Sequence, residues 1–225
     1  MAKPRLLFLS LGGTITMVPS AEGGITPKLG AAELVASVPA LGEVAEIDAQ
    51  SPFKLPSPSL TTGNLVDVAA AINKGFAAGF DGAVVIQGTD TIEESAFLLD
   101  LLVDSDKPVV ITGAMRGADA PGADGPANLL SAAIVAAAPE SRGLGTLAVL
   151  NYDIHAARFV QKSHTALPSA FLSPLVGTIG TVIERRPHYY VRVTRNPTLP
   201  ATAGAPAPIA LVVVLVRRGR RSETT

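Results

Sequence analysis

Residues 83–94, AVVIQGTDTIEE, run from an apolar stretch through a threonine-rich loop into the acidic start of a helix. Residues 6–16, LLFLSLGGTIT, have the same order, and an apolar stretch at 109–112 likewise runs into a short loop at 113–116. Short apolar runs of this kind are typical of strands buried on both faces of a parallel sheet. Ligands bind at the carboxyl ends of such strands, so the three loops are expected to meet at one site.

Apolar runs alternate with helical patterns along the chain, which predicts repeated β-α-β units. The expected fold class is therefore α/β, a doubly wound and mostly parallel sheet. Leu65, Val68, Ala69 and Ile72 follow helical spacing after Thr61 or Thr62, either of which can cap a helix. Other expected helices lie at 31–38, 92–103 and 125–138, the last capped by Asp124, and further strands lie at 44–49 and 146–150.

Two β-hairpins are expected in the later part of the chain. One spans residues 154–160 and carries Lys162 just past its second arm, and a smaller one pairs 182–184 with 189–193. The connection at 17–27 contains two adjacent glycines and a proline at each end, and it suits either a lid over the site or an ordinary long loop.

Composition excludes several classes of function. Of the 225 residues, 48% are hydrophobic, which indicates a globular domain with a large core, and the net charge of -1 argues against nucleic acid as a partner. Without cysteine there is no disulfide or zinc-thiolate site, and His155, His164 and His188 lack ligand spacing, so they are expected on the surface or in loops and no metal is expected. No apolar run is long enough for a signal-peptide core or a membrane span, which predicts a cytoplasmic protein without membrane partners.

Hydrolytic chemistry needs a nucleophile, a base that activates it, and donors for the developing oxyanion. Cysteine is absent, and no GxSxG motif presents a serine, which leaves the threonines of the two loops as candidates. A threonine hydroxyl is weakly nucleophilic at neutral pH, so a base such as a lysine amine must lie within hydrogen-bonding distance.

The sequence resembles the bacterial-type L-asparaginases and their glutaminase-asparaginase relatives. The resemblance rests on GGTIT at 12–16, QGTDTIEESA at 87–96, DKPVVITGAMR at 106–116 and ADGPANL at 123–129, and it extends over residues 5 to 195. It implies hydrolysis of L-asparagine to L-aspartate and ammonia without a cofactor, through an acyl-enzyme on Thr14. Thr89, Asp90 and Lys162 correspond to the family's second catalytic set. The substrate-binding residues that it implies are Ser57, Pro58, Gly88, Thr89, Asp90 and Ala114.

The resemblance also defines an expected domain organisation. Residues 1–194 would be the catalytic N-terminal domain, 195–208 an interdomain linker, and 209–225 the remnant of a truncated C-terminal domain that begins with its first strand. The family forms homo-oligomers through that domain, so a homo-oligomer is not expected here. Ile25 also lies near the position where the family carries a lid tyrosine. Two alternatives therefore remain open: an impaired remnant that at most binds a small amino acid, and a glutaminase-asparaginase that also takes L-glutamine.

Overall fold

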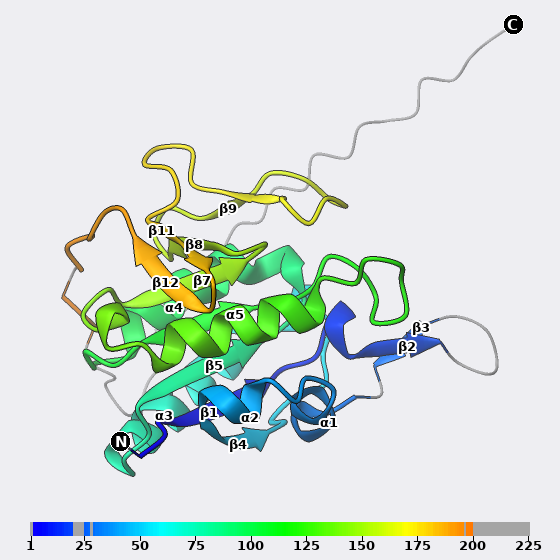
Figure 1. The fold of residues 1–225 in the computed structure, drawn as a ribbon, viewed down its shortest axis with the longest axis horizontal. Helices are drawn as coiled ribbons and strands as arrows, with labels where there is room; N and C mark the ends of the chain where they lie inside the picture. The colour runs from blue at the N-terminus through cyan, green and yellow to red at the C-terminus, as the bar shows by residue number, and fades with distance from the viewer. Residues whose placement is uncertain (1, 20–24, 28, 196, 200–225) are drawn as a thin grey trace, which may run out of the picture.

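The computed structural model describes residues 2–19, 25–27, 29–195 and 197–199. Within them, eight strands form one mixed sheet in the order β12-β11-β8-β7-β6-β5-β1-β4 (Figure 1). The five strands from β7 to β4 in this order run parallel to one another: β1 (Arg5–Ser10), β4 (Glu46–Gln50), β5 (Gly82–Ile86), β6 (Val109–Thr112) and β7 (Thr146–Leu150). The predicted α/β fold with a mostly parallel sheet is confirmed.

Helices cover both faces of the sheet (Figure 1). One face carries α1 (Ala31–Ala36), α2 (Leu41–Val44) and α5 (Gly125–Ala137), and the other carries α3 (Thr62–Ala77) and α4 (Ile92–Leu102). Side chains alternate along β1, so Leu6 and Phe8 pack into the first core and Leu7 and Leu9 into the second. Both faces of β1 are buried because each has its own layer of helices.

The sequence predicted two N-caps, Thr61 or Thr62 for α3 and Asp124 for α5. The backbone N–H of Asn64 donates to the Thr61 hydroxyl at 3.2 Å, which confirms Thr61 as the N-cap of α3. Asp124 occupies the N-cap position of α5 as predicted, but its side chain makes no capping hydrogen bond to that helix. Its carboxylate instead accepts hydrogen bonds from the backbone N–H groups of Met115 and Arg116, both at 2.9 Å.

Both predicted hairpins need correction. The first turn lies at Asn151 and Tyr152, whose positive φ angles of 51° and 66° connect β7 directly to the antiparallel strand β8 (Asp153–Ala156). Lys162 belongs to a separate two-stranded sheet, β9 (Gln161–Lys162) with β10 (Phe171–Leu172). The second hairpin joins β11 (Gly180–Ile183) to β12 (Arg186–Tyr189), so its second arm begins earlier than expected.

The histidine prediction was wrong for His155. This residue lies on β8 with no exposed surface, and its Nδ1 is 2.9 Å from the Ser173 Oγ, so it is part of the core rather than of a loop or the surface. Burial lowers the pKa of His155 to about 4, which keeps the ring neutral at physiological pH.

Two predicted segments lie partly outside the described residues. The connection at 17–27 begins and ends as an antiparallel pair, β2 (Met17–Pro19) and β3 (Ile25–Pro27), whereas residues 20–24 and the side chain at Ile25 are outside it. Residues 200–225 are also outside, and they include most of the expected linker and the expected strand at 209–216. Among the described residues, no helix has the length and apolar character needed to cross a membrane.

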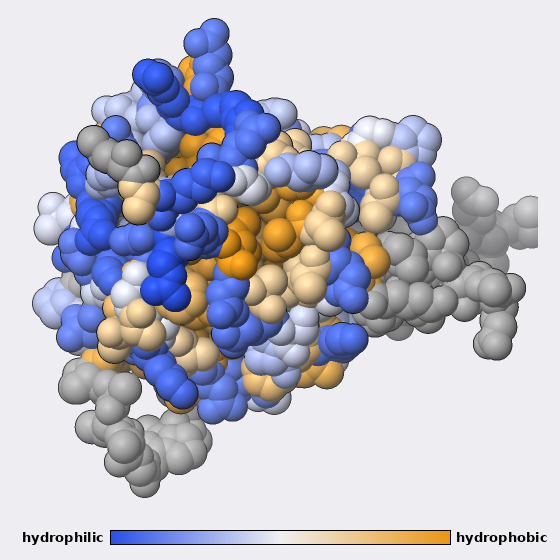
Figure 2. Space-filling view, turned by 60° about the horizontal axis from the view of Figure 1, so that its bottom comes forward, coloured by the Kyte–Doolittle hydropathy of each residue, from blue (hydrophilic) through white to orange (hydrophobic). Residues whose placement is uncertain are grey.

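Four short 3-10 turns complete the described elements, and the first three of them contribute residues to the threonine loops or to their surroundings. They are η1 (Thr14–Thr16), η2 (Ser57–Ser59), η3 (Thr89–Thr91) and η4 (Pro139–Ser141). On the face seen in the space-filling view, apolar side chains interrupt the hydrophilic surface (Figure 2). Exposed apolar area of this kind is ordinary in folded proteins and does not by itself indicate a binding surface.

Candidate active site

The two threonine loops are in direct contact. They follow β1 and β5, which are neighbouring strands, so both loops emerge from the same edge of the sheet. Gly13 has φ +93°, and a Cβ built there would lie 2.2 Å from the backbone nitrogen of Gly88. Only a residue without a side chain permits this approach. Thr14 and Thr89, which directly follow these glycines and begin η1 and η3, are brought to one place as a result.

Lys162 reaches the second loop from the β9–β10 sheet. Its Nζ donates to the Thr89 Oγ1 at 2.8 Å and to the Asp90 Oδ1 at 2.5 Å. The lysine side chain is 13% exposed, whereas that of Asp90 is 63% exposed, so the ammonium is sheltered and the carboxylate remains open to solvent. A hydroxyl, an amine and a carboxylate therefore form one connected set.

Ser57, the first residue of η2, also belongs to the site. Its side chain is buried, with 1% of its surface exposed, and its Oγ has no hydrogen-bond partner among the described residues. A Cβ on Gly88 would lie 2.8 Å from this oxygen, so the hydroxyl sits directly against the second loop. The Thr91 hydroxyl donates to the Ser57 carbonyl at 3.2 Å and holds η2 in this position.

These residues line one cavity of about 160 Å³. Seven of the eight predicted site residues are among its lining: Thr14, Ser57, Pro58, Gly88, Thr89, Asp90 and Lys162. Ala114 is not, because its side chain is buried in the core beneath the site with 1% of its surface exposed. Its neighbour Met115 lines the cavity instead.

Four lining residues were missed by the sequence reasoning: Gly13, Pro56, Met115 and Thr165. Gly13 and Met115 lie within the segments at 12–16 and 106–116, and Pro56 directly precedes the predicted Ser57, so predicted neighbours gave the available signal. Thr165 lies in the loop between β9 and β10, where no motif or periodicity marks it.

Comparison with known proteins identifies the family of the chain. The sequence matches the N-terminal domain of asparaginases (Asparaginase, N-terminal) over residues 5–195. The chain belongs to the asparaginase family. L-asparaginase 2 of Bacillus subtilis is 39% identical over 186 residues, which are 80% of this chain and 50% of that protein. A probable L-asparaginase of Deinococcus radiodurans is 42% identical over 200 residues, which are 87% of this chain and 60% of that protein.

A solved structure supports the same assignment. The crystal structure of a probable cytoplasmic L-asparaginase from Campylobacter jejuni matches with a TM-score of 0.84 at 33% identity, over 88% of this chain and 63% of that chain. The chain thus spans about half to three fifths of the length of these asparaginase relatives.

The third strand-end loop of this asparaginase-family domain is held by a polar network behind the cavity. Asp124 binds the backbone of Met115 and Arg116, and the Asn128 side chain donates to the Gly113 carbonyl at 2.9 Å and to Asp124 at 3.1 Å. The Asn128 Oδ1 also accepts from the backbone N–H of Asn151 at 2.9 Å. Because these bonds fix the loop after β6, Met115 is positioned against the ligand cavity.

Two carboxyl groups outside the lining of this cavity have perturbed pKa values. Burial raises the pKa of Glu94, a hydrogen bond to its own backbone opposes the rise, and the adjacent Glu93 charge adds to it. Burial also raises the pKa of Asp153. Within the described residues no group of three or more His, Asp or Glu side chains could hold a metal ion.

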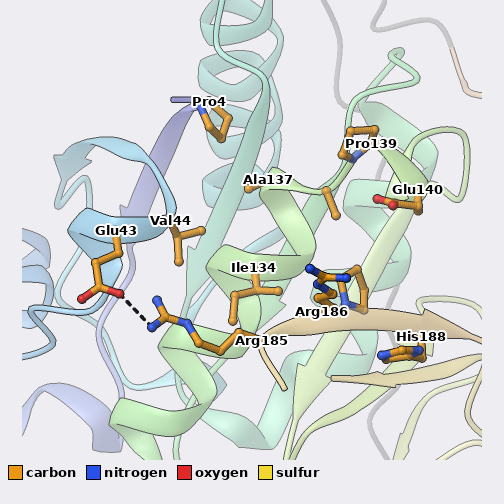
Figure 3. A pocket seen from close by; sticks show the side chains of 12 residues that line it. Pro4, Glu43, Val44, Ile134, Ala137, Pro139, Glu140, Arg185, Arg186 and His188 are labelled. Atoms are coloured by element: carbon orange, nitrogen blue, oxygen red, sulfur yellow. Dashed lines mark hydrogen bonds and ion pairs between the residues drawn. The ribbon is translucent and has the colours of Figure 1, made fainter. Parts of the chain in front are cut away.

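A larger cavity of this asparaginase-family domain, of about 640 Å³, shares no lining residue with the cavity at the threonine loops. Figure 3 shows the side chains that line it. Pro4, which precedes β1, and Pro139, which follows α5, both line it, so it sits at the amino ends of the parallel strands. An ion pair between Glu43 and Arg185 at 2.8 Å borders it (Figure 3). None of the predicted catalytic residues lines this cavity, which makes the smaller one the candidate active site.

Proposed function

We propose that this domain hydrolyses the side-chain amide of L-asparagine to give L-aspartate and ammonia. The observation that carries the proposal is the contact between the Lys162 Nζ and the Thr89 Oγ1 at 2.8 Å, in a cavity that Thr14 also lines. A hydroxyl next to a sheltered amine, in a cavity that a second threonine lines, can supply the nucleophiles and the proton acceptor that amide hydrolysis requires.

The reaction divides into two steps. In the first, the Thr14 Oγ1 bonds to the amide carbon, the bond from that carbon to nitrogen breaks, and ammonia leaves with the hydroxyl proton. In the second, water attacks the resulting ester, the bond from carbon to the Thr14 oxygen breaks, and the proton lost by water returns to Thr14. Thr89 and Lys162 assist because the amine lies within hydrogen-bonding distance of the hydroxyl and can accept or return a proton.

The cavity also suits the two charged ends of a free amino acid. The buried Ser57 hydroxyl, which has no partner within the part of the chain that the structure describes, can donate to the α-carboxylate. The Asp90 carboxylate, with 63% of its side chain exposed, can accept from the α-ammonium group. A volume of about 160 Å³ is well below the roughly 300–1,000 Å³ of pockets for drug-sized ligands, which favours a small substrate.

Two alternatives remain, and each has its own observation. A relative in Pseudomonas fluorescens, 34% identical over 191 residues, is a glutaminase-asparaginase, which makes L-glutamine a second candidate substrate. The chain spans about half the length of several relatives, which makes binding of an amino acid without turnover the other candidate. The expected cytoplasmic location stays a prediction, because one relative, from Haemophilus influenzae, is called periplasmic.

Ammonia release from L-asparagine and from L-glutamine by the purified chain tests the proposal. We expect release with L-asparagine, and we expect the loss of at least about a hundredfold in rate in both Thr14→Ala and Thr89→Val. Undiminished rates in both variants would reject the site. Calorimetric binding of L-aspartate without any ammonia release from either amide would favour the binding function instead.

A further inference from the structure

Lys162 lies on an element that the main sheet does not hold. The strand β9 has two residues and pairs only with the two-residue strand β10, in a sheet separate from the eight-stranded one. Two-stranded ribbons of this size are marginally stable without other support. The position of the lysine therefore depends on contacts outside its own sheet.

Glu93 supplies such a contact. Its Oε2 accepts a hydrogen bond from the backbone N–H of Lys162 at 2.7 Å, between residues that are 69 positions apart in the chain. The other end of the same lysine, the Nζ, is bound by Thr89 and Asp90. One helical segment, residues 89–93, thus holds Lys162 both at its main chain and at its amine.

We propose that Glu93 is a positioning residue for Lys162, and this inference rests on the proposed function of the site. The lysine side chain has four rotatable methylene groups, so fixing only the Nζ would leave the backbone of β9 free to move toward or away from η3. The bond from the backbone N–H to the Glu93 carboxylate is charge-assisted, which makes it stronger than a bond between neutral groups. It therefore sets the distance over which the amine must reach Thr89.

The helix dipole alone could explain an acidic residue at position 93, in the first turn of α4, so this effect must be distinguished from the positioning of Lys162. An acidic residue there interacts favourably with the helix dipole wherever its side chain points. Glu94 lies in the same turn and is half-buried like Glu93, but its Oε2 has no hydrogen-bond partner in the described ranges. Glu94 is therefore the matched control, because it shares the dipole term and lacks the bond to Lys162.

The first measurement compares kcat and KM for L-asparagine in Glu93→Ala, Glu93→Met, Glu93→Gln and Glu94→Gln. Glu93→Ala and Glu93→Met remove the acceptor, and Met keeps the length of the side chain if Ala should prevent folding. Both are expected to lower kcat about 10- to 100-fold with little change in KM, since a shift of about 1 Å in a catalytic group can cost about a hundredfold. Glu93→Gln keeps an acceptor oxygen and is expected to retain most of the activity, as is Glu94→Gln.

The second measurement does not depend on turnover. Amine-reactive labelling followed by peptide mass spectrometry gives the modification rate of Lys162, with Lys107 as an internal reference because its Nζ donates to the Phe76 and Phe80 carbonyls instead. Loss of the Glu93 acceptor is expected to raise the Lys162 rate several-fold and to leave Lys107 unchanged. Glu93→Gln and Glu94→Gln should label as the unmodified chain does.

The outcomes separate this inference from the proposed function. A chain that releases no ammonia but shows faster Lys162 labelling in Glu93→Met refutes the amidase and supports the positioning contact. Unchanged labelling and unchanged kcat in Glu93→Met would overturn the positioning contact while leaving the amidase intact. Equal impairment in Glu93→Gln and Glu93→Met would also overturn it, because the charge rather than the accepted hydrogen bond would then be responsible.

Discussion

Replacement of Gly13 by alanine tests whether the contact between the two loops builds the site. The new Cβ would lie 2.2 Å from the Gly88 nitrogen and 2.4 Å from its Cα, against 3.4–4 Å for ordinary contact. The loops must then part by about 1 Å. A residue with a side chain at positive φ costs about 1–2 kcal/mol, and overpacking costs about 1–3 kcal/mol, so Gly13→Ala should lower the free energy of unfolding by about 2–5 kcal/mol.

Gly143→Ala is the matched control for the backbone term. Gly143 has φ +75°, and a Cβ there would meet nothing within 4 Å, so only the cost of positive φ applies. The difference between the two variants in the free energy of unfolding in urea gives the cost of the clash. The rate of ammonia release measures the effect of the clash on the site. Gly13→Ala should lose about a hundredfold in kcat/KM through the displaced threonines, whereas Gly143→Ala should lose little. Equal unfolding free energies and unchanged kcat/KM in both variants would refute the reasoning.

Three further predictions concern single side chains. The buried Asp100 carboxylate pairs with two arginines, so Asp100→Asn should cost about 3–5 kcal/mol in urea unfolding, whereas Asp106→Asn, at an exposed pair, should cost less than about 1 kcal/mol. Because burial lowers the pKa of His155 to about 4 from 6.5, the folded state binds fewer protons than the unfolded state between these values. Stability should therefore fall by about 3 kcal/mol as pH drops from 6.5 to 4, and His155→Gln should abolish this fall in pH-dependent thermal unfolding. Ser57→Ala should raise KM for L-asparagine about 10- to 100-fold and leave the free energy of unfolding equal or higher, because it removes a buried hydroxyl without a partner; an unchanged KM would exclude Ser57 from substrate binding.

The parallel part of the fold was predictable because strands buried on both faces of a sheet consist of continuous apolar runs, which are visible in the sequence. Each of β5, β6 and β7 is a continuous run of buried residues, and each predicted loop follows such a run. The convergence of Thr14 and Thr89 follows from the same signal, since loops after neighbouring parallel strands share one edge of the sheet.

The region around Lys162 was less predictable for the opposite reason. Strands of two residues, such as β9 and β10, have no periodicity, so their pairing is decided by contacts such as that with Glu93 rather than by local sequence. The turn at Asn151 and Tyr152 was missed because tyrosine seldom adopts positive φ. His155 was misplaced because its partner, Ser173, is 18 residues away.

The motif at 106–116 did not predict which side chain, that of Ala114 or that of Met115, lines the cavity. Both belong to the recognised segment at 106–116, but adjacent residues in a loop can face the core and the cavity in turn. Hydrogen bonds from Asp124 and Asn128 hold the backbone of this loop, and they come from residues 9 to 15 positions further along the chain.

Covalent trapping on Thr14 tests the central claim most directly. The chain is incubated with L-asparagine, quenched with acid within the first turnovers, digested and analysed by peptide mass spectrometry, with Thr14→Ala in parallel. The peptide containing Thr14 is expected to gain the mass of one aspartyl group, and the same peptide from Thr14→Ala is expected to gain none. Ammonia release accompanied by an adduct on a different residue, or by the same adduct in Thr14→Ala, would contradict this claim.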